Sequence, residues 1–178
     1  MNYLSNYNVQ FSGLSEGIHI FDFSADKLFF VCFEESEIEE GNVQVQVELE
    51  KRSTYLRLNF ILKGEVELTC DRCLGKYFQD IQGNFPMLVK FTTEFTEDTD
   101  EVIYLQQGES QVNVAKLIYE FIVLSVPMRR IHPDDKEGNS VCDPEMLKKI
   151  EEYKIRDTEE NKMIDPRWND LRKIIGNN

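Results

Sequence analysis

The chain has 178 residues, 41% of them hydrophobic, and its 20 Lys and Arg against 33 Asp and Glu give a formal net charge of −13. This length is enough to bury the core of one domain. Such an acidic surface repels phosphate, so we expect weak or no direct binding to naked nucleic acid. A basic protein would be a better partner for this surface. The charge could also serve only to keep the protein soluble.

The amino-terminal segment and the cysteines favour a cytoplasmic protein. The first ten residues, MNYLSNYNVQ, have neither the basic segment nor the apolar core of a secretory signal. The longest apolar stretch, around Phe121 to Val126, is far too short to cross a bilayer. Four cysteines are too few and too unevenly spaced for the disulfide framework of a small secreted domain. We therefore expect reduced thiols, a cytoplasmic location and no membrane partner.

The first two thirds of the chain predict β-strands. Val43 to Glu50 alternates apolar and polar residues, the pattern of a strand with one face on a core. A second alternation runs from Leu56 to Leu62 and resumes in the same parity at Val66, so we expect a turn or bulge at Gly64. Half-polar strands are typical of an antiparallel sheet. Shorter strands are expected at Ile18–Phe23, Leu28–Phe33, Tyr77–Ile81, Met87–Thr92 and Val102–Leu105.

Helical signals follow the strands. Asn113 is expected to cap a helix near residues 113–126, which is apolar nearly all round and should pack on the sheet. Asp143-Pro144 and Asp165-Pro166 each predict a further helix start. We therefore predict an α+β fold, built as a mainly antiparallel β-sheet or partly open barrel with one buried helix and a helical C-terminal tail. The expected division is a β-rich domain over residues 1–140 and a tail over residues 141–178.

The sharpest local feature is Cys70-Asp71-Arg72-Cys73, where two thiolates at this spacing could hold one metal ion. Structural zinc takes four Cys or His ligands, so two more would have to come from His132 with Cys142, or from Cys32. The pair could instead be a redox centre, although no predicted helix begins there to lower a cysteine pKa. A tight turn with no ligand is the third reading, and the spacing leaves it open.

Sequence motifs of common enzyme families are missing. The chain has no Gly-rich phosphate loop, no HExxH and no GxSxG, and its only histidines are His19 and His132. Arg129 and Arg130 form the one locally basic patch, and the aspartates that follow favour contact with an acidic loop of the same protein over phosphate. We expect no enzyme activity and no catalytic residue. A metal- or thiol-dependent enzyme of unknown substrate is the alternative.

Two segments taken together resemble the YceD family. Val66 to Leu74 is similar to that family's strand ending in a Cys-x-Arg-Cys turn. Val112 to Pro127 is similar to its helix ending in a Leu-x-x-Pro-like segment, which is followed by a His and then a Cys. The tail with Asp165-Pro166-Arg167-Trp168 resembles the ending of Bacteroidetes-type members.

This resemblance implies a function and a possible ligand set. The family is associated with accumulation of large-subunit ribosomal RNA, which implies a non-enzymatic role in ribosome biogenesis. A ribosomal protein or a pre-ribosomal particle is then the expected partner, and the cofactor is either zinc or none. The family motif in the turn is Cys70, Arg72 and Cys73. The positions that together contain four possible zinc ligands are Cys70, Cys73, His132 and Cys142.

Overall fold

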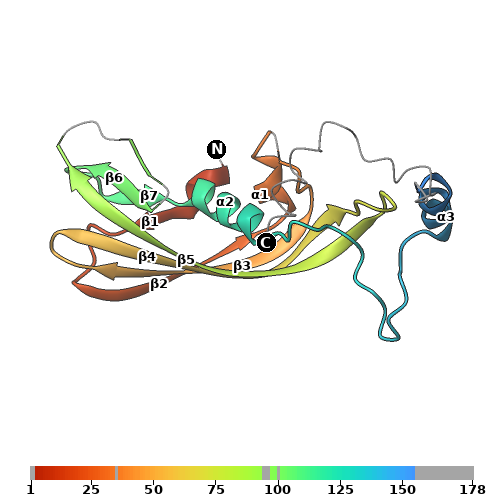
Figure 1. The fold of residues 1–178 in the computed structure, drawn as a ribbon. Coiled ribbons are helices and arrows are strands. Elements are labelled where there is room, and N and C mark those ends of the chain that lie inside the picture. The colour runs from red at the N-terminus through yellow and green to blue at the C-terminus, as the bar shows by residue number, and fades with distance from the viewer. Residues whose placement is uncertain (1–2, 35, 94–96, 100, 155–178) are drawn as a thin grey trace, which may run out of the picture.

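The fold is an open sheet with the helices α1 and α2 on one of its faces (Figure 1). The computed structural model describes residues 3–34, 36–93, 97–99 and 101–154. Its elements are η1 (Tyr3–Tyr7), β1 (Asn8–Gln10), β2 (Gly17–Ala25), α1 (Lys27–Val31), β3 (Gly41–Lys51), β4 (Tyr55–Thr69), β5 (Lys76–Thr92), β6 (Val102–Gln106), β7 (Gln111–Asn113), α2 (Ala115–Ser125) and α3 (Pro144–Tyr153). Five strands form one sheet in the order β2-β3-β4-β5-β6, and β1 pairs with β7 in a second. The long strands make one curved layer, with α1 and α2 on the same side of it (Figure 1).

The main sheet follows the alternation in the sequence. β3 and β4 run antiparallel, with Val45 opposite Leu62 and Val47 opposite Phe60. All four of these side chains are buried, so two apolar rows lie side by side under the helices. Burying such rows supplies most of the free energy that holds a sheet to its core. The predicted α+β fold is confirmed, and the sheet is open rather than a closed barrel.

The strand predictions around β5 need correction. The strands expected at Tyr77–Ile81 and Met87–Thr92 are parts of one continuous strand, β5. β6 pairs with β5 in parallel, with Leu88 opposite Val102, although every other pairing in this sheet is antiparallel. Polar alternation indicates which face of a strand is solvated and carries no sign of a neighbour's direction. The alternation pattern therefore could not predict that β6 pairs with β5 in parallel.

Gly64 lies inside β4, so the predicted turn or bulge there is wrong. It pairs with Val43 of β3 on one side and with Ile81 of β5 on the other. A Cβ at this position would lie 2.1 Å from the Asn42 backbone oxygen and 2.6 Å from the Val43 Cα. Glycine is needed because the neighbouring backbone approaches too closely for any side chain.

The segment Leu28–Phe33, expected to be a strand, begins as the short helix α1. Asp26 caps this helix, and its carboxylate accepts a hydrogen bond from the Phe29 N–H at 3.1 Å. Phe29 and Phe30 of this helix are buried in the core. A short apolar run fits a buried strand or a helical turn equally well, so the capping side chain decides between them.

α2 packs on the sheet as the sequence predicts for residues 113–126. Phe121 stacks on Phe85 of β5, with ring centroids 4.5 Å apart. Val114 holds the N-cap position, and one residue earlier Asn113 accepts the Ala115 N–H through its side-chain oxygen at 3.1 Å. Stacked aromatic rings of this kind fix the position of the helix on the sheet.

α3 begins where Asp143-Pro144 predicts a helix start. The Asp143 carboxylate accepts the N–H of the residue two positions later at 2.8 Å. No residue of α3 is fully buried, although Met146 and Leu147 pack partly against the core. The helix expected from Asp165-Pro166 lies outside the described residues, and the division of the chain near residue 140 stays a prediction. No helix in the described part of the chain is long and apolar enough to cross a membrane.

Candidate metal centre

Four side chains of metal-binding types meet in one cluster. Cys70 directly follows β4, and Cys73 lies in the turn before β5. His132 and Cys142 come from the irregular segment between α2 and α3. One donor atom of each residue lies within 4.8 Å of the donor atoms of the others, and the three cysteines are buried. Residues far apart in the sequence are thus placed where one ion could bind them all.

The spacing of the donor atoms matches the edges of a tetrahedron. The sulfurs of Cys70 and Cys142 are 3.7 Å apart. Nδ1 of His132 lies 3.4 Å from the Cys73 sulfur and 3.7 Å from the Cys142 sulfur. Zinc–sulfur bonds of about 2.3 Å and zinc–nitrogen bonds of about 2.0 Å give tetrahedral edges of roughly 3.8 Å between sulfurs and roughly 3.5 Å between sulfur and nitrogen. Three of the six donor–donor distances thus match a tetrahedral zinc site, the others lie within 4.8 Å, and the cysteines are free of disulfides.

A tight turn between β4 and β5 presents the first two cysteines. The Leu74 N–H donates to the Cys70 carbonyl, and the Cys70 N–H donates to the Gly75 carbonyl, both at 2.9 Å. Leu74 has φ of 60°, in the left-handed region that costs a residue with a side chain about 1–2 kcal/mol. The paired strands close the turn where Thr69 faces Lys76. The strand pairing therefore holds the backbone in a conformation that a free chain would avoid.

The segment that carries His132 is fixed to the same turn. The Asp71 N–H donates to the Arg130 carbonyl at 2.7 Å, and the Arg130 N–H donates back to the Asp71 carboxylate at 3.0 Å. The His132 ring packs near Tyr77, with ring centroids 5.0 Å apart. The Arg130 guanidinium binds Glu37 at 2.6 Å, which confirms that this arginine contacts an acidic loop of the same protein. The hydrogen bonds of Arg130, two residues earlier, and the packing on Tyr77 therefore position His132.

Hydrogen bonds from the backbone favour the ionised form of the Cys70 thiol. Burial opposes its ionisation, but the backbone N–H groups of Cys73, Arg72 and His132 donate to the sulfur and lower its pKa to about 6. Burial raises the pKa of Cys142, and the neighbouring sulfurs act in the same direction. A bound cation would offset these costs because it binds thiolates, and it would release the remaining protons.

The comparisons with known proteins point to one family. Residues 58–175 match the family described as large ribosomal RNA subunit accumulation protein YceD. The chain belongs to the YceD family. No curated protein and no solved structure gives a match. The YceD match includes all four residues of the cluster, so the site lies within the part of the chain that the family shares.

Cys32, the alternative ligand that the sequence left open, is not part of the cluster. It follows α1, and its thiol donates to the Leu28 carbonyl at 3.2 Å. Cys70 follows a strand, so no helix amino terminus lies at the Cys-x-x-Cys motif to activate a redox thiol. His19, the other histidine, bonds to the Ser15 carbonyl.

Gly75 is a supporting position that the sequence reasoning missed. A Cβ there would lie 3.3 Å from Cε1 of His132 and 3.4 Å from the sulfur of Cys73. The available signal was a glycine two residues after the second cysteine of the motif. Absence of a side chain lets the histidine and the cysteine approach each other.

We expect Gly75→Ala to weaken zinc binding by about tenfold while leaving the chain folded. The added methyl group would push the histidine and the cysteine sulfur by a few tenths of an ångström, and changes next to ligands typically cost 10–100-fold in affinity. Competition against a chromophoric chelator measures the effect. Gly13→Ala is the matched control, because a Cβ at Gly13 meets nothing within 4 Å. Equal affinities in the two variants would contradict the geometry described for the cluster.

Proposed function

We propose that this chain is a non-enzymatic ribosome biogenesis factor that supports the accumulation of large-subunit ribosomal RNA. Membership of the YceD family supports the ribosomal role. The net charge of −13 supports a basic ribosomal protein, or a pre-ribosomal particle that contains one, as the partner. The factor would act in the cytoplasm. In this proposal the ending Asp165-Pro166-Arg167-Trp168 groups the chain with Bacteroidetes-type members.

We further propose that the cluster holds one structural zinc ion through Cys70, Cys73, His132 and Cys142. Four protein donors within 4.8 Å of one another would fill the coordination shell of one ion and leave no position for water or substrate. The observation that supports the non-enzymatic proposal is that four protein donors, enough to close a zinc site, lie together. The ion would join the β4–β5 turn to the irregular segment before α3, which has little secondary structure of its own.

A metal- or thiol-dependent enzyme is the second candidate. The lowered pKa of Cys70 favours it, because reactive cysteines are those that ionise easily. Against it, the Cys70 side chain is 0% exposed, whereas reactive cysteines are reached by solvent and substrate. The structural role therefore has the stronger support.

We expect the isolated protein not to bind duplex or structured RNA tightly at physiological salt. RNA affinity depends on cations that are free to neutralise phosphates. In the described structure Lys76 is held by Glu39 and Glu67, and Arg130 is held by Glu37. Filter binding or fluorescence anisotropy with labelled duplex RNA measures this. Submicromolar, sequence-indifferent binding would contradict the proposal of a protein partner.

Sedimentation of cell lysate through sucrose gradients tests the proposed partner. The protein should travel with pre-ribosomal fractions at low salt and leave them at high salt, since salt screens contacts between exposed charges. Its absence from these fractions at every salt concentration would favour the enzyme candidate instead.

A further inference from the structure

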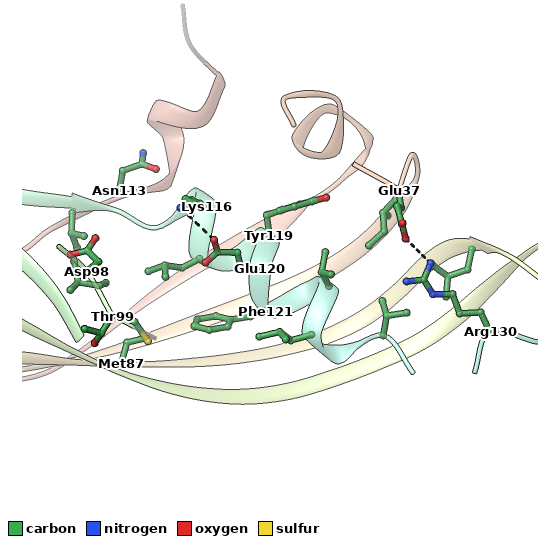
Figure 2. A pocket seen from close by; sticks show the side chains of 18 residues that line it. Glu37, Met87, Asp98, Thr99, Asn113, Lys116, Tyr119, Glu120, Phe121 and Arg130 are labelled. Atoms are coloured by element: carbon green, nitrogen blue, oxygen red, sulfur yellow. Dashed lines mark hydrogen bonds and ion pairs between the residues drawn. The ribbon is translucent and has the colours of Figure 1, made fainter. Parts of the chain in front are cut away.

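A groove runs beside α2 on the face of the sheet that the helix covers. Its volume is about 1070 Å³, and its apolar lining includes Met87, Ile103, Leu117 and Phe121. Figure 2 shows the lining side chains, Met87 and Phe121 among those labelled, gathered around the helix and the strands beneath it. Leu124, also in the lining, is 69% exposed. Large exposed apolar side chains beside a groove mark a surface that is suited to a partner.

The charges of the groove disfavour an anionic ligand. Its two cations are already paired, Lys116 with Glu120 at 3.5 Å and Arg130 with Glu37 at 2.6 Å (Figure 2). Asp98 is a third acidic residue of the lining. The groove therefore offers more acidic groups than basic ones, and its basic groups already have acidic partners. The same ion pairs also engage Glu37 and Glu120, and Asp98 accepts the Tyr104 N–H at 2.7 Å. The lining therefore keeps an excess of one negative charge, which favours a cationic partner over an RNA phosphate.

The metal cluster lies beside one end of this groove. Leu68 belongs to the groove lining and precedes Cys70 by two residues. Arg130 also belongs to the lining and precedes His132 by two residues. Both are thus carried by the two backbone segments that the Asp71–Arg130 hydrogen bonds hold together and that the proposed zinc ion would also join.

We propose that this groove docks an amphipathic, positively charged helix of a partner protein. The apolar face of that helix would lie against Leu124 and the apolar lining, and its basic residues would reach Glu37, Asp98 and Glu120. This inference rests on the proposed function, in which the partner is basic, and adds the surface and the structural form of the contact.

The test uses the full-length protein and a fluorescein-labelled synthetic peptide of Leu and Lys, with Leu at every third and fourth position. A scrambled peptide of the same composition has the same charge without an apolar face. Fluorescence anisotropy should show the amphipathic peptide binding at least about tenfold more tightly, the worth of one well-packed apolar anchor. Equal binding of the two peptides would mean non-specific charge attraction and would overturn the proposal.

Two variants locate the contact. Leu124→Glu should weaken binding of the amphipathic peptide by about tenfold or more. Ile20→Glu is the matched control, because Ile20 is 57% exposed on β2, lies outside the groove lining, and the substitution adds the same negative charge. Equal effects of both substitutions would place the contact elsewhere and overturn the proposal.

The same two variants can also detect a different occupant of the groove. Trp168 is the single tryptophan of the chain. If Leu124→Glu shifts its fluorescence in the absence of peptide and Ile20→Glu does not, the groove binds the chain's own C-terminal segment and the partner proposal is overturned. Loss of large subunits on depletion, combined with no peptide binding, would leave the proposed function standing and refute only the groove.

Discussion

Protein purified without chelator or affinity-metal resin is expected to carry about one equivalent of zinc, and Cys73→Ser is expected to lose it. Removing one of four ligands opens the coordination shell and leaves three donors packed without an ion. We expect the free energy of unfolding to fall by more than about 3 kcal/mol, above the range of a typical point substitution. Elemental analysis measures the zinc, and denaturant unfolding measures the stability.

Cys32→Ser is the matched control, because Cys32 is a free cysteine outside the cluster. It should keep the zinc and change stability by no more than about 1 kcal/mol. Wild-type protein without zinc would contradict the metal proposal, and Cys73→Ser should then cost only a typical 0.5–3 kcal/mol, roughly. A readily reversible disulfide between Cys70 and Cys73 would instead favour the redox reading.

Gly64→Ala is expected to destabilise the protein by about 2–4 kcal/mol. The methyl group would overlap the Asn42 oxygen and the Val43 Cα, which belong to the backbone and cannot rotate away. The central pairing of β3 with β4 would have to separate locally to admit it. Chemical denaturation of the purified variant gives the change in the free energy of unfolding.

Gly13→Ala again serves as the comparison, since nothing lies within 4 Å of a Cβ there. A surface change of this kind should stay within about 0.5 kcal/mol of the wild type. Similar stabilities for the two alanine variants would show that the strands at Gly64 can separate without cost, and the explanation given for this glycine would then be wrong.

Regular patterns made the main elements of the fold predictable. Residues Val43 to Glu50 alternate between apolar and polar, which is a local signal for a strand, and β3 lies where this pattern predicts it. Asp143-Pro144 is a local signal for a helix start, and α3 begins there. α1 was missed because a short apolar run fits two structures and only the Asp26 cap separates them. The β1–β7 pair joins two three-residue strands across the chain, which is too short a pattern to recognise.

The candidate site was predictable only in part. Cys-x-x-Cys spacing names Cys70 and Cys73 as a pair, but spacing alone cannot choose between Cys32 and the His132 with Cys142 combination. That choice depends on the hydrogen bonds that fix the Arg130 segment to the β4–β5 turn, which are contacts between residues far apart in the chain. Membership of the YceD family is now established by the match over residues 58–175. The resemblance to that family, unlike the spacing, favoured His132 with Cys142 over Cys32.

The most direct test of the proposed function is to deplete the protein in its native cells and measure the ratio of large to small ribosomal subunits. The ratio should fall on depletion and should recover when the wild-type chain is supplied again. Cys73→Ser should restore it poorly, because the variant would lose the proposed zinc ion, which would join the segment before α3 to the β4–β5 turn. An unchanged ratio in cells that have lost the protein would contradict the claim that it supports large-subunit accumulation.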